Sequence, residues 1–334
     1  MFFNTRANEF FITWFSVFRL RSPRMKAERL QKQVDLYLKG REGSTMKSYE
    51  SSYKALCVLC KASEVSVFGL GEVERCQLWS MAREMAFSAA KVRGISAVLA
   101  LVNEVMGVTE VVSGREKTMK RGLLKECNLQ AKPKRKREVG LWQDVESLVK
   151  EAERTGGFKE WRTAVMATVC YFGCKRFGDV HRVTVEDVVM DEDVITVFMR
   201  QSKTDKLCEG VSFKMKAAGQ NFSIKEFLQR YLRRFGLKGK DRVFPASLKK
   251  DSKGRAVSYA TMYNSLELLK KTLGLDPGLT WHSFRIGSAT RGTKLGVRRS
   301  VLKGAGLWKS SCVDLYCRED EAGVVLSREL LNDV

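Results

Sequence analysis

The stretch that decides how this chain folds is Leu279-Thr280-Trp281-His282-Ser283-Phe284-Arg285-Ile286-Gly287-Ser288-Ala289-Thr290. Its apolar residues recur at helical spacing, so we expect a helix over 281–295 with Phe284 and Leu295 facing inward. His282 and Arg285 are three residues apart and therefore share one face of that helix. Arg285 is permanently cationic and binds anionic oxygens, while His282 titrates near neutral pH. The pair predicts a phosphate clamp with a group that can move a proton.

Further segments of the chain carry residues suited to the same chemistry. Upstream lie Gly173-Cys174-Lys175-Arg176-Phe177-Gly178-Asp179-Val180 and Gln201-Ser202-Lys203-Thr204-Asp205. Downstream lie Gly304-Ala305-Gly306-Leu307-Trp308-Lys309-Ser310-Ser311 and Val313-Asp314-Leu315-Tyr316. A His-x-x-Arg pair alone is a weak signal. In this order and spacing, however, the set resembles the tyrosine recombinase (phage-integrase-like) family, over roughly residues 45–320 and with no catalytic position missing.

The resemblance implies a role for each of these residues. Tyr316 would be the nucleophile that forms a 3′-phosphotyrosine bond, and because a free phenol has a pKa of about 10 it needs cationic neighbours or a base. Arg176 and Arg285 would bind the non-bridging phosphate oxygens. Lys203 would be the general acid for the departing 5′ oxygen, with Lys206 as a nearby rival.

Three more residues complete the expected site. His282 would share proton transfer with the nucleophile. Trp308 stands where many members of the family have a second histidine, and its indole N–H can donate to a phosphate oxygen. Asp179 follows Arg176 by three residues and would orient its guanidinium, although the family usually has glutamate there.

Length and composition agree with a nucleic-acid partner. The 334 residues suffice for two domains, each with its own core. Sixty Lys and Arg against 38 Asp and Glu give a formal net charge of +22, which favours a polyanion. Other basic proteins share this balance, so charge alone does not assign a function. An apolar content of 44% indicates a folded chain rather than a basic tail.

The cysteines and histidines give no sign of a metal site. Nine cysteines without a regular framework favour a reducing compartment. Cys57 and Cys60 form a C-x-x-C, but the apolar residues around them predict a buried helical face and no second pair stands at zinc spacing. The two histidines are His181, which we expect to pack locally, and His282. We therefore expect neither a metal nor another cofactor.

The first part of the chain reads as helical, with helices expected around 46–62, 72–91, 94–105 and 116–125. Residues 1–24 form a leader of uncertain status. Its apolar run from Phe10 to Phe18 is too short to span a bilayer. A targeting segment and a translation start at Met25 both remain open. Residues 25–127 resemble the small helical core-binding (SAM-like) domain of the family, with a generic helical bundle as the alternative.

A basic linker follows at 128–138 and joins this domain to a catalytic domain over 139–334. Its cations are candidates for contacts with DNA phosphates, for a nuclear localisation signal, or for plain solvation: Lys132, Lys134, Arg135, Lys136 and Arg137. In the catalytic domain we expect one small three-stranded sheet and several helices, the last of them over 311–318. The predicted strands cover 183–189, 194–200 and 211–216.

The expected fold class is therefore mainly α with a small β-sheet. The expected function is a site-specific DNA recombinase or integrase, of mobile-element origin, acting on duplex DNA. By resemblance it assembles as a homotetramer on DNA, with the tail after Tyr316 packing into a neighbour, and it does not act on membranes. Its location is the nucleus if the host is eukaryotic and the cytoplasm otherwise. Two rivals remain: a type IB topoisomerase-like enzyme and a non-catalytic DNA-binding derivative.

Overall fold

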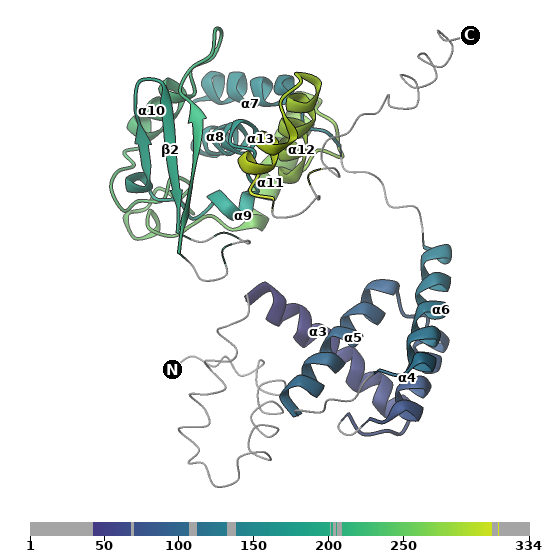
Figure 1. Ribbon diagram of the computed structural model, residues 1–334. Coiled ribbons are helices and arrows are strands. Elements are labelled where there is room, and N and C mark those ends of the chain that lie inside the picture. Colours follow the sequence, from purple (N-terminus) through teal and green to yellow (C-terminus); the bar gives the residue numbers. More distant parts are fainter. Residues whose placement is uncertain are drawn as a thin grey trace, which may run out of the picture. The chain divides into compact units, whose positions relative to one another are not determined.

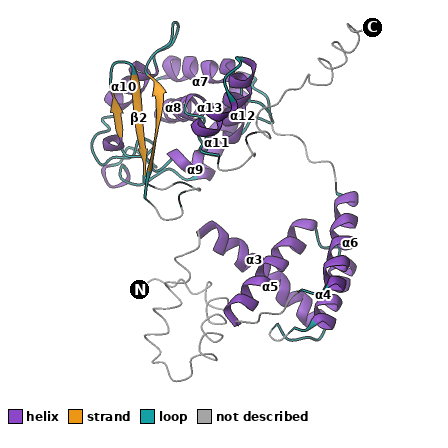
Figure 2. Ribbon diagram, viewed as in Figure 1, coloured by secondary structure: helices purple, strands orange, loops and turns teal. Residues whose placement is uncertain are grey.

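The computed structural model describes residues 43–67, 70–106, 112–131, 138–200, 202, 205, 209–308 and 313. The chain divides into two compact units, Met1–Lys134 and Arg135–Val334 (Figure 1). Helices dominate both units, and the strands among the described residues lie in the second unit (Figure 2). The expected fold class, mainly helical with one small three-stranded sheet, is confirmed.

The first unit is a bundle of four described helices. They are α3 (Gly43–Ala62), α4 (Glu72–Glu84), α5 (Ala89–Met106) and α6 (Gly114–Gln130). Sequence periodicity predicted one helix over 72–91, but the chain turns at Ala86, whose φ is +49°. Ser88 then caps α5 by accepting from the Lys91 N–H. The helix therefore ends early because a left-handed residue interrupts it.

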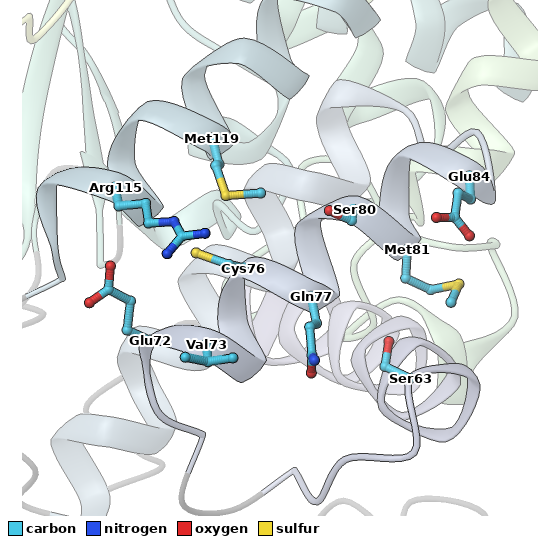
Figure 3. Close-up of a pocket in the computed structure, with 10 residues that line it drawn as sticks. All are labelled: Ser63, Glu72, Val73, Cys76, Gln77, Ser80, Met81, Glu84, Arg115 and Met119. Atoms are coloured by element: carbon cyan, nitrogen blue, oxygen red, sulfur yellow. The ribbon is translucent and has the colours of Figure 1, made fainter.

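The core of this bundle lies around Trp79, which is only 2% exposed. Cys60 belongs to the same core, and burial raises the pKa of its thiol to about 11. The Cys60 thiol is therefore protonated at neutral pH, as suits a structural cysteine. A pocket of about 430 Å³ is lined mostly by residues of α4 and α6, with Met81 and Met119 among them (Figure 3).

The second unit is built around α8 (Phe158–Phe172), in which every residue from Trp161 to Tyr171 is buried. Four helices pack against it: α7 (Trp142–Thr155), α10 (Ile224–Arg234), α11 (Tyr259–Leu273) and α12 (Trp281–Lys294). The short helices of the unit are α9 (Phe177–Val180), α13 (Arg299–Ala305), η1 (Val185–Asp187) and η2 (Lys250–Ser252).

The sheet is antiparallel in the order β1-β2-β3. Its strands are β1 (Val188–Met190), β2 (Val194–Met199) and β3 (Val211–Lys216). The prediction of a strand over 183–189 is largely wrong, because Asp187 accepts hydrogen bonds from the N–H and hydroxyl of Thr184 and closes a 3₁₀ turn. The other two strands agree with the prediction to within one residue.

Candidate active site

Arg285 is the residue at which distant segments meet. A capping box between Thr280 and Ser283 fixes the start of α12, and Arg285 lies in its second turn with no exposed surface. Its Nη1 donates to the Cys174 carbonyl at 2.9 Å, and its Nη2 donates to the Gly306 carbonyl at 2.8 Å. The guanidinium therefore ties α12 both to the turn after α8 and to the end of α13.

Trp308 covers the guanidinium. The Cζ of Arg285 lies 4.0 Å from the centroid of the Trp308 ring, within cation–π range. The indole can fold back so closely because residue 306 is glycine, where a Cβ would overlap the ring. The ring belongs to a small buried cluster made of Cys174, Ala289, Leu302, Trp308 and Val313.

Arg176 and Asp179 form a local pair at the start of α9. The Asp179 carboxylate accepts the Arg176 backbone N–H at 3.1 Å and lies 3.5 Å from its Nη1. The carboxylate thus caps the helix and faces the guanidinium at once. The Arg176 side chain stays 25% exposed, so it can still reach an incoming anion.

Lys175 is a buried cation that sequence reasoning missed. It has no exposed surface, and its Nζ donates to the Ala305 carbonyl at 2.5 Å and lies 4.7 Å from the Phe213 ring centroid. Burial lowers the pKa of its ammonium to about 8, and the positive charges of Arg285 and Arg176 contribute to the shift. In the sequence this lysine stands in a turn-like motif, where lysines are normally solvated, so nothing signalled its burial.

The two histidines have different surroundings. His282 lies in the first turn of α12, one turn before Arg285, and is partly exposed. His181 packs locally as expected: its ring stacks on Phe177 at 4.9 Å and its Nδ1 lies 3.2 Å from the Gly178 carbonyl oxygen. Burial lowers the pKa of His181, with nearby Arg182 adding to the effect.

Some predicted positions lie outside the described residues: Lys203, Tyr316, Lys132, Lys134, Arg135, Lys136 and Arg137. Their roles stay predictions, as does the helix expected over 311–318. Leu295, expected inside, is 63% exposed because α12 ends at Lys294 and Leu295 caps it. Among the described residues, no cluster of His, Cys, Asp and Glu could hold a metal ion. None of the described helices is long and apolar enough to cross a membrane.

The geometry gathers cations in one place. Lys175 and Arg176 follow α8, while Arg285 comes from α12 more than a hundred residues later. Among the described residues, Asp179 is the carboxylate in ion-pair contact with Arg176, and Lys175 makes no ion pair. Two arginines beside a buried ammonium favour binding of an oxyanion.

In comparisons of sequence, no protein-family model and no curated protein matches the chain. Comparison of structures does find neighbours. One is a lambda integrase tetramer bound to a Holliday junction, with a TM-score of 0.58 at 15% identity over 93% of this chain and 78% of that one. Another is the XerH site-specific recombinase bound to palindromic difH substrate in a post-cleavage complex. Its TM-score is 0.54 at 13% identity, over 79% of this chain and 73% of that one.

A third neighbour is the Tn1549 transposon integrase in complex with circular intermediate DNA. It has a TM-score of 0.51 at 12% identity, over 94% of this chain and 98% of that one. The neighbours are tyrosine recombinases, and at these identities the likeness is one of fold. The chain therefore has the tyrosine recombinase fold that its motifs led us to expect.

Proposed function

We propose that this chain is a site-specific DNA recombinase or integrase that cleaves and rejoins duplex DNA through a 3′-phosphotyrosine bond to Tyr316. The proteins that it resembles in fold include a recombinase on its difH substrate and an integrase on circular intermediate DNA. Duplex DNA is accordingly the proposed partner, and the net charge of +22 supports it.

The observation that carries this proposal is the meeting of three segments at Arg285. This residue on α12 is hydrogen-bonded to the turn that precedes Arg176 and to the turn that leads to Trp308. A phosphodiester has two non-bridging oxygens, and two arginines that approach them stabilise the extra negative charge of a pentavalent transition state. Arg176 and Arg285 are the proposed pair.

The reaction follows from the remaining side chains. The Tyr316 hydroxyl attacks the phosphorus and gives its proton to His282. The bond between phosphorus and the 5′ oxygen breaks, and that oxygen takes a proton from Lys203. Rejoining runs in reverse: a 5′ hydroxyl attacks the phosphotyrosine and the tyrosine regains its proton. Because the phosphotyrosine conserves the phosphoester bond, rejoining needs no nucleotide cofactor.

The resting geometry adds a condition to this scheme. The guanidinium of Arg285 is completely covered, with two N–H groups bonded to carbonyls and one face against Trp308. A phosphate can reach it only if the turn from Gly306 to Trp308 shifts. Binding of DNA and rearrangement of this turn are thus coupled in the proposed mechanism, which is a form of induced fit.

The deciding experiment traps the covalent intermediate. Nicked suicide substrates carrying a library of candidate sites lose a short fragment after cleavage, so the protein stays attached to DNA. We expect an adduct with the natural chain and none with Tyr316→Phe. Relaxation of a plasmid without any specific site, and no recombinants from paired sites, would favour the type IB topoisomerase-like alternative. Absence of any adduct would favour a non-catalytic DNA-binding protein.

Assembly and origin belong to the same proposal. One neighbour is a lambda integrase tetramer on a Holliday junction, and another is a transposon integrase. We propose by analogy a homotetramer on paired sites and a mobile-element origin. We also propose that the cations of the basic linker contact DNA and, in a eukaryotic host, direct the chain to the nucleus. Sedimentation of the DNA complex tests the tetramer, since a fully active monomer contradicts it.

A further inference from the structure

The end of α13 is held by two cations. The ammonium of Lys175 contacts the carbonyl of Ala305, the last residue of the helix, at 2.5 Å. The next carbonyl, of Gly306, accepts from Arg285 at 2.8 Å. The last carbonyls of a helix lack partners within it and carry the negative end of its dipole, so both contacts are favourable.

A buried lysine at this place is unusual enough to need a reason. Lysine is almost never fully buried unless it is paired, yet Lys175 has no exposed surface and no ion pair among the described residues. It also lies close enough to Arg176 and Arg285 for their charges to lower its pKa. An apolar residue would fill the space without this repulsion, so what a lysine adds here is the contact of its ammonium with the Ala305 carbonyl and with the Phe213 ring.

The turn beyond Ala305 transmits that contact to the site. The Leu307 N–H bonds the Gly304 carbonyl, and the Trp308 N–H bonds the Lys303 carbonyl at 3.0 Å. Leu307 has a φ of +54°, a conformation that a leucine holds only when its surroundings impose it. The position of Ala305 therefore fixes where Trp308 lies against Arg285.

We propose that Lys175 is a positioning residue for DNA cleavage, which holds the end of α13 at Ala305, so that the turn from Gly306 to Trp308 moves about one fixed point when DNA binds. Tyr316 follows eight residues after Trp308 in the sequence, so a loose helix end would spread the positions open to the nucleophile. Lys175 acts through the Ala305 carbonyl and does not touch DNA. This inference rests on the proposed function.

The test compares Lys175→Met and Lys175→Arg with a matched control, Lys270→Met. Lys270 is also a buried lysine, only 3% exposed, and it donates to the Pro277 and Leu279 carbonyls. Two quantities are measured on the full chain: amide hydrogen exchange of residues 299–308, and the single-turnover rate of adduct formation on saturating suicide DNA. The affinity for the same DNA is measured alongside.

In Lys175→Met we expect exchange in 299–308 to be about tenfold to a hundredfold faster, as suits loss of a hydrogen bond from a charged group. The adduct rate falls by a similar factor while the DNA affinity stays within about twofold, and Lys175→Arg recovers most of the rate. Lys270→Met leaves both the exchange of 299–308 and the adduct rate close to those of the natural chain.

Two results overturn the inference. One is exchange of 299–308 in Lys175→Met that equals that of Lys270→Met. The other is an adduct rate that falls equally in both variants, which assigns Lys175 a purely structural role. A natural chain that forms no adduct on any DNA overturns the proposed function instead. The exchange of 299–308 then still decides whether Lys175 holds α13.

Discussion

At the scale of single residues, the candidate site contains positive charges that are buried away from water, which is unfavourable unless polar groups bind them. Arg285 and Lys175 both lack exposed surface, and the described contacts that hold them in place are mainly to backbone carbonyls. A carbonyl is a weaker partner for a cation than a phosphate oxygen, which carries a full charge. The carbonyls thus keep both cations satisfied without DNA, and a phosphate oxygen can displace the Gly306 carbonyl from Arg285.

Lys175 makes the stability of the second unit depend on pH. Its pKa is lowered from 10.5 to about 8 in the folded chain, so below pH 8 both states are protonated and the folded state bears the full penalty of the buried charge. Between about pH 8 and 10.5 the unfolded state binds more protons, so stability rises with pH, by at most about 3 kcal/mol.

Because other groups also titrate in this range, the measurement is a difference. Denaturant unfolding of the natural chain and of Lys175→Met at about pH 8 and about pH 10 gives two free energies of unfolding for each. We expect the natural chain to gain stability relative to the variant as pH rises. An equal pH dependence in the two proteins would mean that Lys175 is solvated.

The sequence predicted which side chains form the candidate site, but not how deeply they are buried or what they contact. The order of Arg176, His282, Arg285 and Trp308 was readable because charge and spacing are properties of the chain itself. The burial of Lys175 and the covering of Arg285 by Trp308 were not, because they depend on contacts with residues 130 and 23 positions away along the chain. No local pattern records such contacts.

At the scale of elements, periodicity predicted most helices and two of the three strands. It failed where a single residue ends an element, as at Ala86 with its positive φ and at Asp187, which closes a 3₁₀ turn. It failed again at Leu295, where apolar spacing continued past the end of α12. Each failure has a local cause at one residue, which a pattern of apolar spacing over a whole segment does not detect.

In the first unit, α4 and α6 are joined by two ion pairs of very different burial. Glu116 binds Arg75 at 2.9 Å with both side chains 4% exposed, and it also accepts from the Trp79 indole. Glu126 binds Arg83 at 2.9 Å between side chains that are 36% and 67% exposed. The two carboxylates therefore form a matched experiment on one helix pair.

We expect Glu116→Ala to lower the free energy of unfolding by about 3–5 kcal/mol, because it removes the buried carboxylate that balances the Arg75 charge. Glu126→Ala should lower it by about 1 kcal/mol or less, since water screens the exposed pair. Denaturant unfolding of both variants checks the difference. Equal losses would show that Arg75 finds other compensation, for example at the Leu70 carbonyl that it already contacts.

In the second unit, α12 packs directly against backbone. The Gly140 N–H donates to the Ser283 carbonyl at 2.9 Å, and a Cβ at Gly287 would overlap the Gly140 carbonyl oxygen. Gly304 in α13 has open space instead. The segment that opens the second unit is thus seated on the same helix that carries Arg285.

Gly287→Ala must push α12 away from this segment, because backbone atoms cannot rotate aside. We expect it to lower the free energy of unfolding by about 3 kcal/mol despite the better helix propensity of alanine. Gly304→Ala, which meets nothing, should instead be neutral or stabilise by up to about 1 kcal/mol. A stable Gly287→Ala variant would show that α12 can separate from residue 140 without loss.

At the scale of the whole molecule, the excess of 22 positive charges overstates the charge at the surface, because some of the cations are buried and bound within the protein. Arg75, Arg162 and Lys270 are buried and bound to carboxylates or carbonyls of their own unit, so they add nothing to an external surface. The five cations of the linker, over 132–137, are interrupted only by Pro133. They are the best candidates for sequence-independent contacts with phosphates.

Counterion release makes this quantitative. Each phosphate neutralised steepens the fall of log K with log salt by about 0.9, so five linker contacts contribute a slope of about 4.5. Replacing Lys132, Lys134, Arg135, Lys136 and Arg137 by glutamine should therefore make the salt dependence of binding to a non-specific duplex shallower by up to that amount. Affinity at low salt should fall in parallel, and it should converge with that of the natural chain as salt rises.

A control that replaces Lys238 and Lys240, exposed cations of the second unit, tests whether any loss of charge has this effect. If the linker variant and this control shift the slope equally per charge, the linker is only part of a diffuse positive field. If the slope does not change at all, the linker is a solvated connection and contacts with DNA must come from the two folded units.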